Sequence, residues 1–178
     1  MLETLITSKT RIKLLLKFFL NSNSSSYLRN LESEFGESSN AIRLELNKFE
    51  DAGLLYSELD GNKKRFRANT THPLFRDIHN ILLKYIGFDK IILNVIDKLG
   101  NLDKVFVAGA FAHGLDHPVI DLIFVGEDIN RNYMMKLIDK AERIINRKIR
   151  YMVMSQEEFM AFQDTNGGEE LLLLWSEQ

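Results

Sequence analysis

A short turn sequence at residues 60–62 constrains the fold of this 178-residue chain more than any other feature. Asp60-Gly61-Asn62 separates two runs of strand-like composition, Leu54 to Leu59 and Lys63 to Ala68. Asp-Gly between two such runs is the strongest short-range signal for a β-hairpin, because glycine readily adopts the positive φ that a tight turn requires. The sequence therefore predicts an antiparallel hairpin over residues 54–68.

Three amphipathic helices are predicted ahead of this hairpin. They span Lys9 to Leu20, Tyr27 to Phe35, and Ser38 or Ser39 to Ala52. Ser8 precedes the first helix as an N-cap, and Gly36 follows the second as a C-cap. Three helices followed by a hairpin are the layout of a winged helix-turn-helix, which we assign to residues 1–70.

The third helix and the hairpin carry side chains suited to binding DNA. Polar residues lie opposite the apolar stripe of the helix, where they can reach base edges and phosphates in a major groove: Ser39, Asn40, Arg43, Asn47 and Lys48. Four basic residues are expected at the hairpin tip, where a wing meets the DNA backbone or minor groove: Lys63, Lys64, Arg65 and Arg67. A basic cluster is also often just a solvated face. Three helices followed by a hairpin also occur in protein-docking domains, so a protein-interaction module that does not bind DNA stays open.

The segment from Ser39 to Leu55 resembles the recognition helix of ArsR- and MarR-like transcriptional regulators. In that family a polar helix start leads to a leucine-rich core face and an Ala-Gly-Leu step into the wing. The resemblance covers roughly residues 8–70, and it implies binding of double-stranded DNA as a homodimer, with two recognition helices about one DNA turn apart. Metal-sensing members use cysteine or histidine clusters, and this domain has neither.

A helical connector is predicted over residues 71–102, and a small α/β domain over residues 103–178. Pro73 marks the start of the first connector helix. In the domain, the order strand, strand, helix, strand, helix follows from the changing hydrophobic period. The segments are 104–108, 120–125, 130–146, 147–154 and a helix opened by the capping box Ser155 to Glu158. The whole chain is therefore predicted to be of the α+β class.

A second resemblance lies in this C-terminal domain. Val107 to Gly114, followed by Val119 to Phe124, is similar to the signature of polymerase-β-like nucleotidyltransferases. In that superfamily a strand leads into Gly-Ser at a helix start, and a second strand carries Asp-x-Asp. The carboxylates hold magnesium ions beside the nucleotide phosphates. The resemblance covers about residues 88–160 and implies a nucleotidyltransferase-like fold.

The chain departs from that signature where catalysis needs it. What remains of the nucleotide site is Gly109, Ala110 and Asp121. Ala110 stands where the family has serine, Val119 replaces the first carboxylate, and the strand at 148–154 has no carboxylate. A lone aspartate cannot hold two magnesium ions, so we expect no metal, no cofactor and no catalysis there. An active metal-dependent nucleotidyltransferase is the alternative.

Composition limits the remaining possibilities. The chain has no cysteine, which excludes disulfide scaffolds, thiolate zinc sites and cysteine nucleophiles. His113, Asp116 and His117 are metal-binding residue types, but loop spacing does not bring them together, so we interpret them as a polar surface loop. The apolar runs are far shorter than the roughly 20 residues of a membrane span. No secretion signal opens the chain. We expect a cytoplasmic protein without a membrane partner.

Together these patterns predict a DNA-binding transcriptional regulator that is not an enzyme. The winged helix would bind DNA as part of a homodimer. The degenerate C-terminal domain would serve dimerisation, partner docking, or the sensing of a nucleotide or other small-molecule effector.

Overall fold

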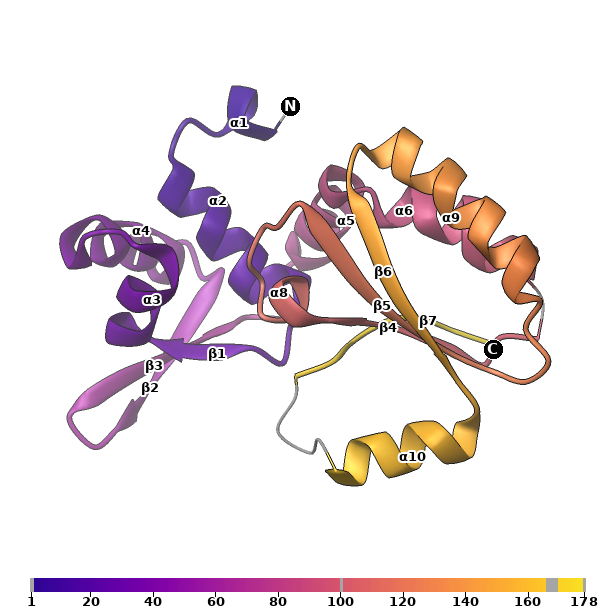
Figure 1. The fold of residues 1–178 in the computed structure, drawn as a ribbon. Helices are drawn as coiled ribbons and strands as arrows, with labels where there is room; N and C mark the ends of the chain where they lie inside the picture. Colours follow the sequence, from indigo (N-terminus) through magenta and orange to yellow (C-terminus); the bar gives the residue numbers. More distant parts are fainter. Residues whose placement is uncertain (1, 100, 166–169, 178) are drawn as a thin grey trace. The chain divides into compact units, whose positions relative to one another are not determined.

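A computed structural model describes residues 2–99, 101–165 and 170–177 (Figure 1). These residues form a mixed α+β protein with two small sheets, in agreement with the predicted fold class. The chain divides into two compact units, Met1–Tyr85 and Ile86–Gln178. The division falls inside the predicted connector, whose helices are shared between the two units. In the described ranges, no helix combines the length and the apolar character that crossing a bilayer requires.

The first unit contains helices and a three-stranded antiparallel sheet of order β1-β3-β2. Its helical segments are α1 (Leu2–Leu5), α2 (Lys9–Leu15), the π-helical η1 (Leu16–Leu20), α3 (Leu28–Phe35), α4 (Ser39–Asp51) and α5 (Phe75–Ile86), which ends at the boundary. Its strands are β1 (Ser25–Tyr27), β2 (Leu55–Asp60) and β3 (Lys63–Ala68). The three predicted helices and the hairpin are confirmed.

Capping residues determine where these helices begin and end. The Ser8 hydroxyl accepts a hydrogen bond from the backbone N–H of Arg11 at 3.2 Å, and the Ser38 hydroxyl accepts one from Ala41 at 3.3 Å. Each bond satisfies an N–H that has no partner inside its helix. Gly36 ends α3 in the left-handed conformation, with φ of 62°. Ser8 and Gly36 are the caps that the sequence predicts, and of the two serines considered for the start of α4, Ser38 is the cap.

Strand β1 was not predicted from the sequence. Serine and asparagine dominate residues 21–26, and that composition indicates only a break between helices. In the structure Ser26 pairs with Phe66, and Tyr27 pairs with Arg65 on β3. A pairing partner about forty residues away, and not local propensity, makes this segment a strand.

An ion pair joins α2 to α4 beneath the exposed face of α4. Arg11 Nε lies 2.8 Å from Glu45 Oε2, and a second guanidinium nitrogen lies 3.3 Å from Oε1. The Glu45 side chain is only 10% exposed. Burial raises the pKa of Glu45, but hydrogen bonds from Arg11 and Lys48 outweigh burial and hold this pKa below its usual value.

Replacing Glu45 by glutamine should cost about 1–3 kcal/mol of unfolding free energy at pH 7, because Arg11 loses a charged hydrogen-bond partner. The pKa of Glu45 is lower in the folded than in the unfolded chain. Its stabilising effect is therefore complete above the unfolded value and is lost as the pH falls through the folded value. Urea unfolding at pH 7 and pH 3 should show the difference between wild type and Glu45→Gln shrinking in acid. An equal difference at both pH values would contradict this assignment.

The second unit is a four-stranded sheet with helices on both faces. Its helical segments are α6 (Phe88–Ile91), η2 (Ile92–Ile96), α7 (Asp97–Leu99), α8 (Gly109–Ala112), α9 (Arg131–Ile145) and α10 (Gln156–Thr165). Its strands are β4 (Lys104–Ala108), β5 (Val119–Val125), β6 (Lys148–Met154) and β7 (Leu172–Ser176). The order is β6-β5-β4-β7, with β5 and β6 parallel and the other pairs antiparallel. Strand β7 was not predicted.

Strand β5 is buried on both of its faces from Leu122 to Val125, so both faces of the sheet are covered there. Helices α6 and α9 lie on one side of the sheet and α10 on the other (Figure 1). On the α10 side, Phe159 packs against Ile123 and Val125. The reciprocal hydrogen bonds of the predicted capping box hold the start of α10, with Ser155 N at 2.8 Å from the Glu158 carboxylate and Glu158 N at 3.1 Å from the Ser155 hydroxyl.

Candidate functional site

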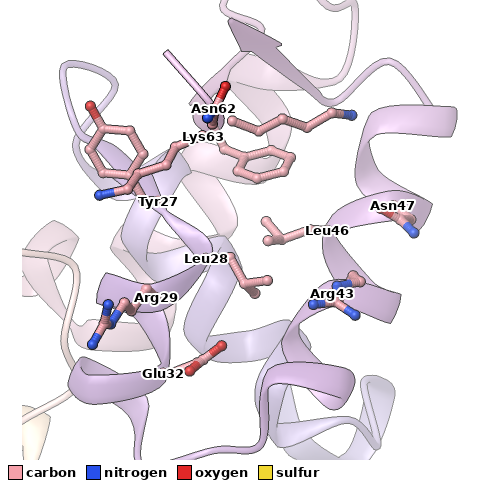
Figure 2. Close-up of a pocket in the computed structure, with 11 residues that line it drawn as sticks. Tyr27, Leu28, Arg29, Glu32, Arg43, Leu46, Asn47, Asn62 and Lys63 are labelled. Carbon is pink, nitrogen blue, oxygen red and sulfur yellow. The ribbon is translucent and has the colours of Figure 1, made fainter. Parts of the chain in front are cut away.

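A groove of about 580 Å³ in the first unit brings α4 and the hairpin together (Figure 2). Leu28 of α3, Leu46 of α4 and Phe66 of β3 give it an apolar lining. Its cationic and amide lining residues come from three elements and from the hairpin turn: Arg29, Arg43, Asn47, Asn62, Lys63 and Lys64. The groove therefore combines the predicted recognition helix and the predicted wing in one surface.

Three of the predicted DNA-binding residues of α4 share one exposed face of that helix. Asn40, Arg43 and Asn47 are exposed at helical spacing, and in Figure 2 Arg43 and Asn47 extend from α4 beside the groove. Among the described residues, no carboxylate forms a salt bridge with Arg43. Lys48 is exposed on the neighbouring side and pairs with Glu45 at 3.2 Å. The guanidinium of Arg43 is thus available to an anionic partner.

Ser39 is less accessible than its neighbours on α4. It is half-buried, and its hydroxyl donates a hydrogen bond to the carboxylate of Glu32 on α3. This contact links the two helices of the helix-turn-helix. Ser39 is therefore engaged within the unit at the start of α4.

The two lysines next to the turn differ in their partners. Lys63 is exposed, and its Nζ lies 5.9 Å from the centre of the Tyr27 ring. Lys64 points to the opposite face of the hairpin, where its Nζ lies 3.3 Å from a Glu50 carboxylate oxygen. Lys63 is the more available of the two cations for a phosphate.

Arg65 connects the turn of the hairpin to Tyr27 of β1. Its guanidinium donates hydrogen bonds to the Tyr27 hydroxyl at 3.0 and 2.8 Å and pairs with Asp60. The Tyr27 hydroxyl in turn donates to Asp60. Hydrogen bonds from Tyr27 and Arg65 lower the pKa of Asp60, and contacts with Tyr27 and Asp60 raise the pKa of Arg65. The charge of Arg65 is largely compensated inside the hairpin.

Arg67 does not lie at the hairpin tip, and this expectation is corrected. It pairs across the sheet with Ser25 and Tyr56, near the end of β3 that is farthest from the turn. The residue is half-buried, and its Nε is buried without a hydrogen-bond partner in the described structure. Spacing within β3 separates it from Lys63 by more than 10 Å of strand.

Sequence reasoning missed Arg29. This exposed arginine is the second residue of α3 and lines the same groove as Arg43 and Lys63 (Figure 2). The sequence does show an arginine in the first turn of the predicted second helix, but only the structure shows that this turn lines the groove.

The residues predicted to be the remnant of a nucleotide site lie in the second unit, and Gly109 and Asp121 line a hollow of about 610 Å³. Asp121 on β5 is in register with Arg150 on β6. Arg150 Nε lies 2.6 Å from Asp121 Oδ1, and Nη2 lies 3.0 Å from Oδ2. This bidentate pair raises the pKa of Arg150. Both oxygens of the remaining carboxylate are therefore bound to a cation that the chain itself provides.

Gly109 approaches the same carboxylate closely. Its φ is +61°, and a Cβ at this position would stand 2.7 Å from Asp121 Oδ2. Ala110 follows in α8 and is half-buried. The strand-to-helix step of the signature is thus present, although the serine is not.

These residues do not fit a pair of magnesium ions. The signature requires three carboxylates, and of these the chain has Asp121. Arg150 hydrogen-bonds to both oxygens of Asp121. His113 contacts Glu170 at 3.0 Å, whereas Asp116 contacts Arg147 at 2.7 Å. Across the described residues, no group of three or more metal-ligating side chains converges.

Comparisons with known proteins find likenesses to solved structures. The protein AF1382 of Archaeoglobus fulgidus is 20% identical, with a TM-score of 0.38 over 46% of this chain and 93% of its own. Reduced HlyU of Vibrio cholerae is 16% identical, with a TM-score of 0.37 over 47% and 82%. A candidate nucleotidyltransferase of Sulfolobus solfataricus is 23% identical, with a TM-score of 0.38 over 55% and 83%. No protein-family model and no curated protein matches the chain.

Proposed function

We propose that this chain is a DNA-binding transcriptional regulator that acts as a homodimer. Helix α4 would enter the major groove, with Asn40, Arg43 and Asn47 reading base edges. Lys63 at the hairpin tip and Arg29 at the start of α3 would bind phosphates on either side. The second unit would serve association or effector sensing.

One observation carries this proposal. The exposed face of α4 and the hairpin tip line a single groove, and that groove has Arg29, Arg43 and Lys63 against one carboxylate, Glu32, besides Lys64, which pairs with Glu50. Glu32 already accepts a hydrogen bond from Ser39. Such an excess of cations beside exposed amides suits a partner with regularly spaced negative charges.

Binding to the DNA upstream of the chain's own gene, measured by fluorescence anisotropy against a scrambled duplex over a salt series, tests the proposal. We expect a preference on the order of a thousandfold for the specific duplex. Equal and steeply salt-dependent binding to both duplexes would favour a protein-interaction module instead.

Lys63→Ala should weaken binding to specific and scrambled DNA alike. Loss of one phosphate contact should also reduce the slope of log K against log salt by about one. Lys136→Ala, which removes another exposed lysine, on α9, is the matched control and should change neither quantity. An unchanged slope for Lys63→Ala would remove the hairpin tip from the interface.

We also propose that the second unit is not a metal-dependent transferase. Magnesium with a nucleoside triphosphate should give no turnover, and magnesium alone should not raise the melting temperature, because Arg150 already neutralises Asp121. Magnesium-dependent turnover that Asp121→Asn abolishes would contradict this proposal and establish the enzyme.

A further inference from the structure

Strand β6 forms one edge of the sheet in the second unit. It pairs in parallel with β5, and no strand in the described part of the chain pairs with its other side. An edge strand presents unpaired N–H and C=O groups that can bond to another strand, so proteins usually protect such edges. The outward backbone groups of β6 that have no hydrogen-bond partner therefore define where another strand could pair.

The ladder with β5 determines which backbone groups of β6 point outward. Lys148 N donates to Pro118 O at 3.0 Å, and Met154 O accepts from Gly126 N at 3.0 Å, so the even-numbered residues point toward β5. Backbone direction alternates along a strand. The groups of Ile149, Tyr151 and Val153 therefore point away from the sheet.

Two carboxylates cap the ends of this outer edge. Glu142 of α9 accepts the outward N–H of Ile149 at 2.8 Å, and Glu158 of α10 accepts that of Ser155 at 2.8 Å. Between these caps, no strand in the described part of the chain pairs with the outward N–H and C=O groups of Tyr151 and Val153. The open part of the edge is thus a short window centred on Met152.

The surroundings of the window are apolar and adaptable. Met152 is 46% exposed and Met135 of α9 is 54% exposed. Both line a hollow of about 570 Å³ together with residues 151–154 of β6. Methionine side chains pack against varied partners because they are flexible and polarizable. Backbone bonds in the window would therefore be accompanied by apolar contact.

Charge differs between the two ends of β6. The exposed side chains of Lys148 and Arg150 stand at its start. At its end, Glu127, Asp128 and Glu158 line a hollow beside Val153 and Met154, with Arg131 as the one basic residue among the lining residues. Lys148 and Arg150 pair with Glu142 and Asp121 of their own chain, so the start of β6 is nearly neutral whereas its end is acidic. An antiparallel partner of the same sequence would place each acidic end beside the start that carries these cations, whereas a parallel one would place the two acidic ends together.

We propose that β6 is the interface between two copies of this chain, paired antiparallel about a two-fold axis at Met152. In this register Tyr151 exchanges both backbone hydrogen bonds with Val153 of the partner subunit, and the reverse pair does the same. This register pairs the outward backbone groups of Tyr151 and Val153, and it leaves intact the hydrogen bonds that Glu142 and Glu158 accept. Two four-stranded sheets then become one continuous sheet. The proposal rests on the proposed function only for the expectation that two copies associate.

Cross-linking through a single introduced cysteine tests this register, because the chain has no cysteine of its own. At the two-fold axis the two copies of residue 152 form a non-hydrogen-bonded pair, whose Cα atoms lie about 4.5 Å apart, within disulfide range. Full-length Met152→Cys should form a disulfide-linked dimer on mild oxidation. Met160→Cys is the control, because Met160 is 50% exposed on α10 and lies outside the window. Equal cross-linking of both variants would overturn the proposal.

The mass of the full-length wild type in solution gives a second, independent test. We expect a dimer whose dissociation constant rises about tenfold or more in Met152→Glu, because two carboxylates would face each other at the axis. A monomeric wild type, or a dimer that Met152→Glu leaves unchanged, would overturn the interface. DNA affinity is measured separately. A monomer that binds its operator refutes this interface and the homodimer but not DNA binding, and a β6 dimer that does not bind DNA refutes the regulator but not this interface.

Discussion

Arg43→Glu should weaken specific DNA binding by about a hundredfold or more. A base-edge contact contributes about 1–3 kcal/mol to discrimination, and the reversed charge adds repulsion from the phosphates. Arg43 has no salt-bridge partner in the described structure, so its replacement should leave the first unit folded. Fluorescence anisotropy with the specific and the scrambled duplex measures the effect, and the preference between the two duplexes should fall as well.

Arg143→Glu is the matched control for this variant. Arg143 is exposed on α9 in the second unit, so the substitution changes the net charge of the chain by the same amount. Its effect on DNA affinity should be small, because Arg143 does not line the groove that carries the proposed interface. If both variants lost affinity equally, α4 would have no special part in binding and the basic surface would act only through overall charge.

Gly126→Ala should destabilise the second unit by about 3 kcal/mol, at the upper end of the usual cost of overpacking. Gly126 follows β5, and its N–H bonds to Met154 O. A Cβ here would stand 2.3 Å from the carbonyl oxygen of Asn101 and 3.0 Å from the Cα of Leu102. Both are backbone atoms, so relief of the clash requires the chain before β4 to move.

Hydrogen exchange resolved along the chain measures this effect, because it separates the opening of the two units. Protection should fall in residues 86–178 and stay unchanged in residues 1–85. Gly36→Ala is the control: its φ is +62°, and a Cβ there meets nothing within 4 Å. It should cost only the left-handed strain of about 1–2 kcal/mol, in the first unit. A Gly126→Ala chain as stable as the wild type would show that this close approach is not rigid.

Much of the first unit could be predicted because its signals are local. Ser8, Gly36 and Gly61 each act within one turn of chain, and the hydrophobic period of α4 separates its buried face from the face with Arg43. The same reasoning could not find β1, because its residues become a strand only by pairing with β3. It also placed Arg67 with the tip residues because Arg67 is close to them in sequence. An extended strand carries it away from the turn, so it lies at the far end of β3.

In the second unit the sequence showed where the chain departs from the signature that it resembles, and the structure showed what binds the carboxylate that remains. Val119 and Ala110 could be identified as departures by inspection. That Arg150 binds Asp121 could not, since the contact depends on the register between β5 and β6. A shift of one residue would have turned Arg150 to the other face of the sheet.

The sequence by itself determined the helices, the hairpin, the α+β class and the positions where the signature's carboxylates are absent. Each of these depends on residue types within a few positions of one another, and short-range sterics and hydrogen bonding act over that distance. The tertiary structure alone decided which strands pair, which cation neutralises Asp121 and which backbone groups of β6 remain open. These depend on strand order and register, which are set by burial of whole faces and not by any local run of residues.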